Sequence, residues 1–205
     1  MAGTTPGSTA ITAPPEALDA SFYERPVVEV ARALVGCVVE LGGVSGVIVE
    51  TEAYHESEPA CHAHVGLTAR TATLFGAPGR AYVYRSYGIH ALLNAVCEEE
   101  GVGAAVLIRA LEPLTGIERM WRRRGVREER ELCSGPGKLS QALGVELAHN
   151  GADLQEGPLT VRRPPRPRAP DEIVASTRIG ITKAPELRWR FCARDNAYVS
   201  SPRPR

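Results

Sequence analysis

The chain has 205 residues, of which 43% are hydrophobic and 23% charged, so it is long enough for one domain with a sizeable core. No apolar run reaches the roughly 18 residues of a membrane-spanning helix, so no membrane contact is expected. The 24 basic and 24 acidic residues cancel, but residues 162–205 hold 11 Lys or Arg against 4 Asp or Glu. A neutral average can conceal a basic face that binds phosphate, although solvated surface arginines would give the same pattern.

The N-terminal stretch MAGTTPGSTAITAPPEA has no basic region followed by an apolar core, so a secretory signal is not expected. Its small and Pro-rich residues are typical of disorder. We therefore expect a disordered tail over residues 1–20 and a single domain over residues 21–205.

The first helix is predicted to begin with Pro26 in its first turn and to end at Gly36, because apolar residues recur between them at helical spacing, at positions 27, 30, 31 and 34. Two β-rich runs, CVVEL and VSGVIVETEAY, then flank the pair Gly42-Gly43 and predict a hairpin. Residues 55–80 are predicted to be irregular, with a turn at the GAPG sequence.

A second hairpin is predicted from strands at 81–87 and 90–96, with Gly88 in its turn, and another strand from residues 104–112. Pro113 is expected to open an arginine-rich helix to about Arg124, and Ser134 to cap a short helix that ends at Gly144. The rest of the chain is predicted as a basic linker at 162–170 and short strands at 177–182 and 188–193. The predicted fold is one mixed α/β (α+β) domain, with antiparallel hairpins around a curved sheet and helices at its periphery.

The second strand carries a carboxylate beside an aromatic residue. Alternation places Ile48, Glu50, Glu52 and Tyr54 on one face of the strand. Glu52 beside Tyr54 could be a general base beside a stacking platform. A sheet-edge glutamate next to a core tyrosine is the structural alternative.

Three of the six tyrosines lie within AYVYRSY. Tyr82 and Tyr84 share one strand face, whereas Tyr87 precedes the Gly88 turn. An aromatic residue at such a tip could wedge between base pairs, as side chains do in proteins that kink DNA from the minor groove. Packing of the aromatic residues across the hairpin is the alternative.

Asn94 and Arg109 lie inside apolar, strand-like runs. Buried Asn and Arg side chains need partners, and such groups often line a ligand pocket, although structural hydrogen bonding would explain them equally well.

The segment CSGPGKLS resembles a phosphate-binding loop, but Leu132 stands where a Walker loop needs its first glycine. Nucleotide hydrolysis is therefore excluded on spacing. The backbone at Ser134, Gly135, Gly137 and Lys138 could still grip a phosphate of DNA at the start of a helix.

Five dispersed cysteines without a CxxC pair indicate reduced thiols in an intracellular protein and argue against a zinc knuckle. Cys61, His62 and His64, together with Glu52, could bind a metal, but the remaining candidate ligands are dispersed and the pattern is weak.

Taken together, several segments resemble the alkyladenine (3-methyladenine) DNA glycosylase family. They occur in the family's order, cover roughly residues 25–200, and include the following stretches: VETEAY (49–54), RAYVYRSYGIHALLN (80–94), VLIRALEPLTG (106–116), ELCSGPGKLSQALG (131–144) and RIGITKA (178–184).

The resemblance implies a single-domain α/β fold whose protruding hairpin enters the minor groove of DNA. It implies Glu52 as the base that activates water, with Arg109 as a ligand for that water or for a phosphate. It implies Tyr54 and Tyr84 as plates around a flipped base, with a histidine of EPACHAH, expected to be His62, on the other face. The resemblance also implies Tyr87 as the intercalating wedge and Asn94 as the pocket residue that disfavours normal guanine.

The expected function is excision of alkylated or otherwise damaged purines from double-stranded DNA, which leaves an abasic site. No metal, organic cofactor or obligate protein partner is expected, and the expected location is the bacterial cytoplasm, at the nucleoid when DNA is bound. Two alternatives remain, a metal-dependent hydrolase built on the Cys/His/His segment and a non-catalytic protein that binds damaged DNA.

Overall fold

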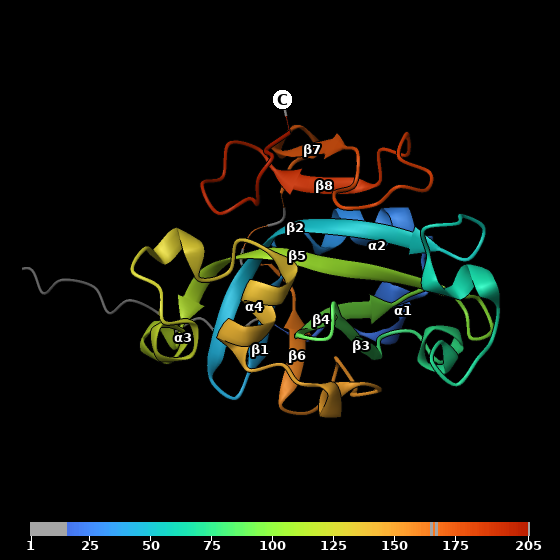
Figure 1. The fold of residues 1–205 in the computed structure, drawn as a ribbon, viewed down its shortest axis with the longest axis horizontal. Helices are drawn as coiled ribbons and strands as arrows, with labels where there is room; N and C mark the ends of the chain where they lie inside the picture. Colours follow the sequence, from blue (N-terminus) through green and yellow to red (C-terminus); the bar gives the residue numbers. More distant parts are fainter. Residues whose placement is uncertain (1–15, 165, 167, 205) are drawn as a thin grey trace, which may run out of the picture.

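A computed structural model describes residues 16–204 except 165 and 167 (Figure 1). It contains an antiparallel eight-stranded sheet, in which six strands follow the order β3-β4-β5-β2-β1-β6 and the β7–β8 hairpin joins through β8 beside β2. The predicted mixed α/β domain built on antiparallel hairpins is confirmed. The strands are β1 (Val38–Leu41), β2 (Val44–His55), β3 (Ala81–Ser86), β4 (His90–Val96), β5 (Ala104–Thr115), β6 (Leu159–Arg162), β7 (Ile173–Ser176) and β8 (Arg190–Ala193).

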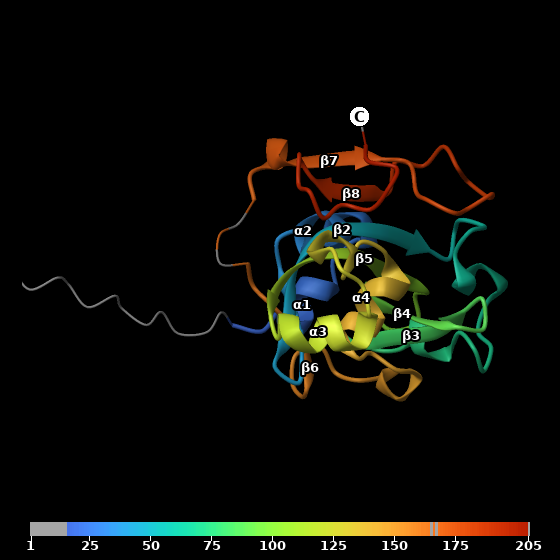
Figure 2. The same cartoon turned by 60° about the vertical axis from the view of Figure 1, so that its left-hand side comes forward.

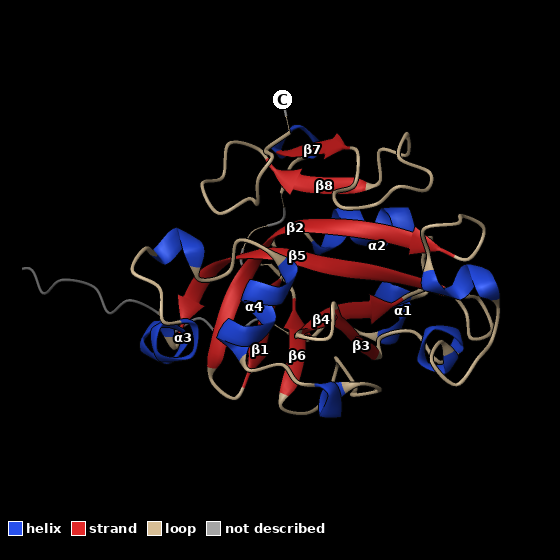
Figure 3. Ribbon diagram, in the orientation of Figure 1, coloured by secondary structure: helices blue, strands red, loops and turns tan. Residues whose placement is uncertain are grey.

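The helices are short and cover the sheet, as Figure 3 shows. The α-helices are α1 (Ala20–Tyr23), α2 (Val27–Leu34), α3 (Ile117–Arg124) and α4 (Pro136–Leu143), and the 3-10 helices are η1 (His62–Val65), η2 (Ala72–Phe75), η3 (Glu129–Glu131), η4 (Leu147–His149) and η5 (Pro170–Glu172). Helix α2 packs against β2 and β5, whereas α4 packs against β4 and β5. Figures 1 and 2 show the β7–β8 hairpin outside β2 at one side of the domain.

The β1–β2 hairpin and the β3–β4 hairpin form as predicted. Gly42 and Gly43 both adopt positive φ angles, of 56° and 75°, in the first turn, and Gly88 does so at 71° in the second. Glycine tolerates this left-handed region without the clash of a Cβ atom. The glycines that predicted the two turns are therefore required by them.

The long β2–β5 ribbon positions the polar residues that matter below. Its pairing shifts register on both sides of Glu50, so the expected alternation from Ile48 is interrupted there. From Glu50 to Tyr54 the alternation holds, because Arg109 of β5 contacts both Glu50 and Glu52, and Tyr54 contacts Glu52.

Two predicted boundaries and one predicted strand are wrong. Strand β5 continues through Pro113 to Thr115, so the arginine-rich helix begins only at Ile117. Proline has no N–H group to donate to a strand ladder, but its φ angle fits both extended backbone and the first turn of a helix. Pro113 by itself therefore did not distinguish a strand from a helix. In the third case, residues 177–182 are not a strand, because β7 ends at Ser176 and Arg178 then turns into the interior.

The proposed cap of α4 is also wrong. Gly135, with φ of 155°, occupies the N-cap position and makes no side-chain cap hydrogen bond. Ser134 lies one residue earlier, and its Oγ is 3.4 Å from Lys138 Nζ. Pro136 in the first turn has no N–H group to be satisfied, which reduces the need for a capping side chain.

At the N-terminus the described chain joins the domain earlier than the expected boundary. Leu18 is buried, its N–H donates to the Val161 carbonyl (2.9 Å), and Asp19 caps α1. The first 15 residues of the expected tail lie outside the described residues.

The core is a continuous cluster between the sheet and its helices, and it includes Cys37, Cys97, Cys133 and Cys192. All five cysteines are buried and free, as the dispersed pattern predicted. Across residues 16–204, leaving aside the two undescribed positions, no helix has the length and apolar character to cross a membrane.

Candidate active site

A cavity of about 600 Å³ opens between the β3–β4 hairpin, the end of β2, helix η1 and the start of α4. This volume suits a single small organic ligand or nucleobase. Of the eleven residues predicted to be catalytic, to contact the flipped base or to contact DNA, nine line it: Tyr54, His62, Tyr84, Tyr87, Asn94, Arg109, Gly135, Gly137 and Lys138. The fold thus gathers segments that are far apart in the sequence around one cavity.

Aromatic rings form one wall of the cavity. Tyr82 and Tyr84 stack with centroids 5.3 Å apart, and His62 meets Tyr84 edge-on at 4.6 Å. His62 Nδ1 lies 3.1 Å from the Tyr82 hydroxyl. Burial lowers the pKa of His62, with a further contribution from the positive charge of Arg70, so this wall presents a neutral imidazole at neutral pH. Such a wall is suited to stacking on a planar ring.

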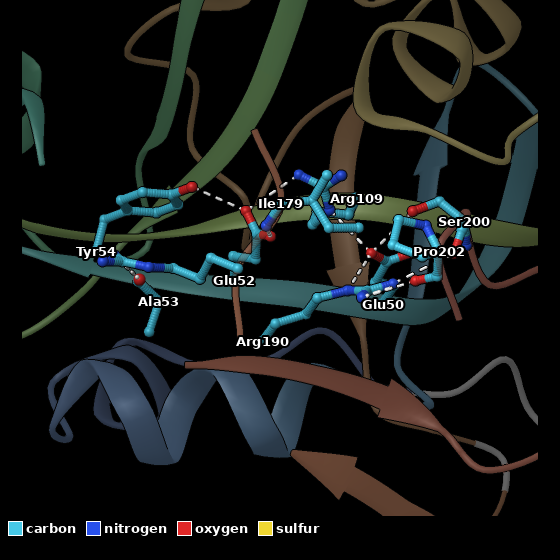
Figure 4. A network of polar contacts seen from close by, with 10 residues as sticks. Glu50, Glu52, Ala53, Tyr54, Arg109, Ile179, Arg190, Ser200 and Pro202 are labelled. Carbon is cyan, nitrogen blue, oxygen red and sulfur yellow. Dashed lines mark hydrogen bonds and ion pairs between the residues drawn. The ribbon is translucent and has the colours of Figure 1, made fainter. Parts of the chain in front are cut away.

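Glu52 is fully buried behind Tyr54 and Arg109, which line the cavity, and does not itself line it. Figure 4 shows its contacts with both residues. Three donors hold its carboxylate: the Tyr54 hydroxyl (2.8 Å) and Arg109 Nη1 (3.0 Å) donate to Oε2, and the Ile179 N–H (2.7 Å) donates to Oε1. A carboxylate has about four lone-pair sites. The donors among the described residues therefore leave one acceptor position, on Oε1, for a further donor such as water.

Arg109 is shared between two carboxylates on neighbouring positions of one strand face. Its Nε donates to Glu50 Oε1 (2.9 Å), while its Nη1 reaches Glu52. Burial alone would raise the pKa of Glu50, but the charges of Arg109 and Arg190 and the hydrogen bonds from Ser200 lower it below its ordinary value. For Glu52 burial prevails, so its pKa is raised despite Arg109 and the donors from Ile179 and Tyr54.

A buried ion pair that the sequence did not reveal lies beside Tyr54, behind the lining of the cavity. Arg178 pairs with both carboxylate oxygens of Glu58, at 2.6 and 3.0 Å, and its guanidinium lies 4.6 Å from the Tyr54 ring centroid. Arg178 also donates to the Ala53 carbonyl (2.9 Å). The pair anchors the chain just before Ile179, so the N–H of Ile179 faces Glu52. The arginine that begins RIGITKA was the sequence signal for this ion pair, and its partner Glu58 lies 120 positions earlier.

Asn94 and Tyr87 occupy opposite ends of the hairpin. Asn94 is buried, and its Nδ2 donates to the carbonyls of Tyr82 (3.0 Å) and Leu92 (3.4 Å), which leaves Oδ1 as an acceptor on a residue that lines the cavity. Tyr87 sits in the turn with φ of 48° and is 92% exposed. The predicted position of Tyr87 at an exposed tip is confirmed, whereas its role as a wedge stays a prediction.

The segment predicted to contact the DNA backbone begins α4 beside the hairpin. A Cβ atom on Gly137 would come within 2.8 Å of the His90 side chain, so this position requires a glycine for close packing. Lys138 lies exposed at the rim of the cavity, and Ser134 lies outside the cavity.

The residues considered as metal ligands do not converge. His64 Nδ1 donates to the Glu56 carbonyl (2.8 Å), and the Cys61 thiol lies 3.9 Å from the Gly103 carbonyl. His64 lines a neighbouring cavity and not the one before Glu52. Among the described residues, no group of three or more His, Cys, Asp and Glu is arranged to hold a metal ion.

Comparison with known proteins agrees with the resemblance seen in the sequence. Residues 21–197 match the model of the methylpurine-DNA glycosylase family. A Rhodopseudomonas palustris protein with the name "Putative 3-methyladenine DNA glycosylase" is 54% identical over 184 residues, which cover 90% of this chain and 88% of its own. Proteins of the same name from Methanoculleus marisnigri (49% over 188 residues, 89% and 98%) and Rubrobacter xylanophilus (53% over 175 residues, 83% and 90%) are also similar. The chain belongs to the methylpurine-DNA glycosylase family, and it is a DNA glycosylase.

Proposed function

We propose that this enzyme removes alkylated purines from double-stranded DNA by hydrolysing the N-glycosidic bond with a water that Glu52 activates. The observation that carries the proposal is a fully buried carboxylate at the back of an aromatic-walled cavity, held by three donors with one acceptor position left on Oε1. The names of the relatives point to 3-methyladenine as a substrate base.

The chemistry of the substrate explains why the cavity needs a base more than an acid. A purine alkylated at N3 or N7 carries positive charge, so it leaves with the bonding electron pair as a neutral base without prior protonation. Water then forms a bond to C1′ while the bond from C1′ to the purine nitrogen breaks. Glu52 takes the proton of the water and stabilises the positive charge on the sugar, by analogy with glycoside hydrolysis. This route requires neither a metal nor an organic cofactor.

The reaction requires the base to leave the helix, because the cavity cannot reach a stacked base pair. In the proposal, Tyr54, Tyr84 and His62 surround the extruded purine, and Asn94 disfavours normal guanine. Tyr87 fills the gap left in the duplex. The backbone from Ser134 to Lys138 contacts DNA phosphates at the start of α4. The enzyme acts in the cytoplasm on chromosomal DNA and needs no obligate protein partner.

A single-turnover assay tests the proposal. Wild type and Glu52→Gln are incubated in excess over methylated duplex DNA, and released 3-methyladenine is quantified while binding is measured separately. We expect Glu52→Gln to bind but to lose excision by at least about a hundredfold, the scale of general base catalysis. Wild-type excision by this variant would exclude Glu52 as the base. Absence of excision by the wild type would favour a non-catalytic binding protein.

The product distinguishes hydrolysis from a Schiff-base mechanism. The chain has two lysines: Lys138 lines the cavity but is exposed at the start of α4, and Lys183 is exposed and lines the neighbouring cavity. We therefore expect an intact abasic site without strand cleavage, since strand-cleaving glycosylases use an amine nucleophile. A covalent enzyme–DNA adduct trapped with borohydride would contradict this mechanism.

A further inference from the structure

Glu50 is a buried charged residue that the proposed reaction does not use. It is fully buried on β2, two residues before Glu52, and its carboxylate is saturated with donors. Oε1 accepts from Arg109 Nε (2.9 Å), Arg190 Nε (2.7 Å) and Ser200 Oγ (2.9 Å), and Oε2 accepts from the Ser200 N–H (2.8 Å). Burying a carboxylate costs desolvation free energy, and this cost is offset only when the charge is fully paired.

The far side of this cluster is built from the C-terminal part of the chain. Arg190 lies in β8, and besides Glu50 it donates to the carbonyls of Pro202 (3.0 Å) and Ser200 (3.2 Å). Figure 4 shows Arg190, Ser200 and Pro202 grouped around Glu50, with Arg109 between Glu50 and Glu52. Apart from Arg109, Glu50 is therefore fixed by groups that do not line the cavity.

The geometry of Arg109 transmits this fixed position to the site. Its planar guanidinium has five N–H donors in a rigid arrangement. Once Nε is bonded to Glu50, the plane of the group is set, and Nη1 lies 3.0 Å from Glu52 Oε2. Without the Glu50 contact, the guanidinium could rotate and present a different nitrogen to Glu52.

We propose that Glu50, anchored by Arg190 and Ser200, is a positioning residue that orients Arg109 against Glu52 and divides the charge of Arg109 between the two carboxylates. The proposal rests on the role proposed above for Glu52. Arg190 and Ser200, which do not line the cavity, would thereby contribute to catalysis.

The division of charge has a measurable consequence. The charged and titratable groups coupled to Glu52 are Arg109 of β5, Glu50 and Tyr54 of β2, Arg178 of the segment before Ile179, Tyr84 and Cys192. Arg190 of β8 stands opposite Glu52 in the pairing of β2 with β8. The negative charge of Glu50 raises the pKa of Glu52 directly and also draws on the same arginine. Neutralising Glu50 should therefore lower the pKa of Glu52.

The experiment is a pH profile of single-turnover excision of 3-methyladenine by the full-length chain. In the wild type we expect the rate to fall on the acid side as Glu52 is protonated. In Glu50→Gln this acid limb should move to lower pH by about one unit, the lower end of the shifts caused by a nearby charge. Glu98→Gln is the matched control, because Glu98 accepts from the Val27 N–H and lies beside His55, away from Arg109 and Glu52. Its acid limb should stay in place.

A second variant makes the test two-sided. Arg190→Gln removes a positive charge from Glu50, which should then hold Arg109 more strongly, so the acid limb should move to higher pH. This variant keeps both carboxylates and carries the test if Glu50→Gln does not fold. An unmoved acid limb in either folded variant would overturn the inference, because a purely structural role would change rate or stability without shifting the limb. Failure of the proposed function is distinguishable, because Glu52→Gln would then excise like the wild type.

Discussion

The side chains of strand β2 and those at the tip of the β3–β4 hairpin differ in how far they are buried. Glu50 and Glu52 of β2 are fully buried, whereas 92% of Tyr87 and 74% of Ile89 are exposed at the tip. Each buried carboxylate is compensated inside the molecule by arginines and backbone donors. Tyr87 and Ile89, in contrast, are left largely in contact with solvent by the hairpin.

The difference indicates where each region completes its interactions. A buried charge is stable only with partners, so β2 is complete within the protein itself. A pair of exposed apolar side chains loses water only when another molecule covers it, so we expect a binding partner to cover the tip. Under the proposed function, the DNA duplex is the expected partner, and the proposed wedge would account for the exposure.

The largest effect is expected where a buried pair beside β2 is broken. In Arg178→Met, the Glu58 carboxylate stays buried without its cation. Breaking a buried pair in this way costs about 3–5 kcal/mol. Chemical denaturation at neutral pH should therefore show a correspondingly lower free energy of unfolding for Arg178→Met.

Two comparisons separate the charge from the loss of packing. The double variant Arg178→Met with Glu58→Gln removes both charges and should regain part of the lost stability. Glu172→Gln, in the exposed pair with Arg166, should unfold like the wild type. If Arg178→Met is as stable as Glu172→Gln, the buried charges of this region do not depend on internal pairing.

At the hairpin tip we expect a loss of activity without a loss of stability. Stacking of an aromatic side chain on a base is worth about 1–3 kcal/mol, so Tyr87→Ala should slow excision about ten- to hundredfold when the lesion is well paired. The loss should be smaller for the same lesion in a mismatch, because extrusion then costs less.

Leu114→Ala is a suitable control, since Leu114 is 49% exposed at the end of β5 and does not line the cavity. It should excise both substrates like the wild type. Equal losses for Tyr87→Ala on paired and mismatched lesions would mean that Tyr87 is a packing residue and that the exposure of the tip has another cause.

The same contrast explains what could be predicted from the sequence. The β1–β2 and β3–β4 hairpins were predictable because their turns need glycine and their side chains alternate over short distances. Tyr87 at the tip followed from the same local pattern. The long-range partners were not predictable from spacing, because Ser200 reaches Glu50 across 150 positions and Arg178 reaches Glu58 across 120.

The errors in local structure have a similar origin. Pro113 fits both the first turn of a helix and the end of a strand, and pairing with β2 decided for the strand. Residues 177–182 have the composition of a strand, but the buried contacts of Arg178 and Ile179 take that segment to the cavity. Tertiary contacts prevailed over local propensity in both cases.

A smaller effect should separate the two histidines of the CHAH segment. His62 contacts Tyr82 and Tyr84 in the cavity, whereas His64 bonds to a backbone carbonyl beside it. Aromatic contacts of this kind are worth about 0.5–1.5 kcal/mol. His62→Ala should therefore reduce single-turnover excision several-fold to about tenfold, whereas His64→Ala should stay within about twofold. A greater loss for His64→Ala would move the base-contacting role to that residue.

The smallest effect concerns how the stability of two variants depends on pH. An unfolded glutamate has a pKa of about 4.3. Because the folded pKa of Glu52 is raised, its contribution to stability is fully present below the unfolded pKa and is lost as pH rises through the folded pKa. Glutamine carries no charge at any pH. The melting temperature of Glu52→Gln relative to the wild type should therefore increase from acid to neutral pH.

Glu50 should show the opposite trend, because its folded pKa is lowered. Its contribution is present above the unfolded pKa and is lost as pH falls through the folded pKa. The melting temperature of Glu50→Gln relative to the wild type should then decrease from acid to neutral pH. Opposite slopes would mean that one arginine stabilises Glu50 while Glu52 is kept at a cost to stability, as expected of a catalytic base. Parallel slopes would contradict this assignment, because both carboxylates would then be structural in the same sense.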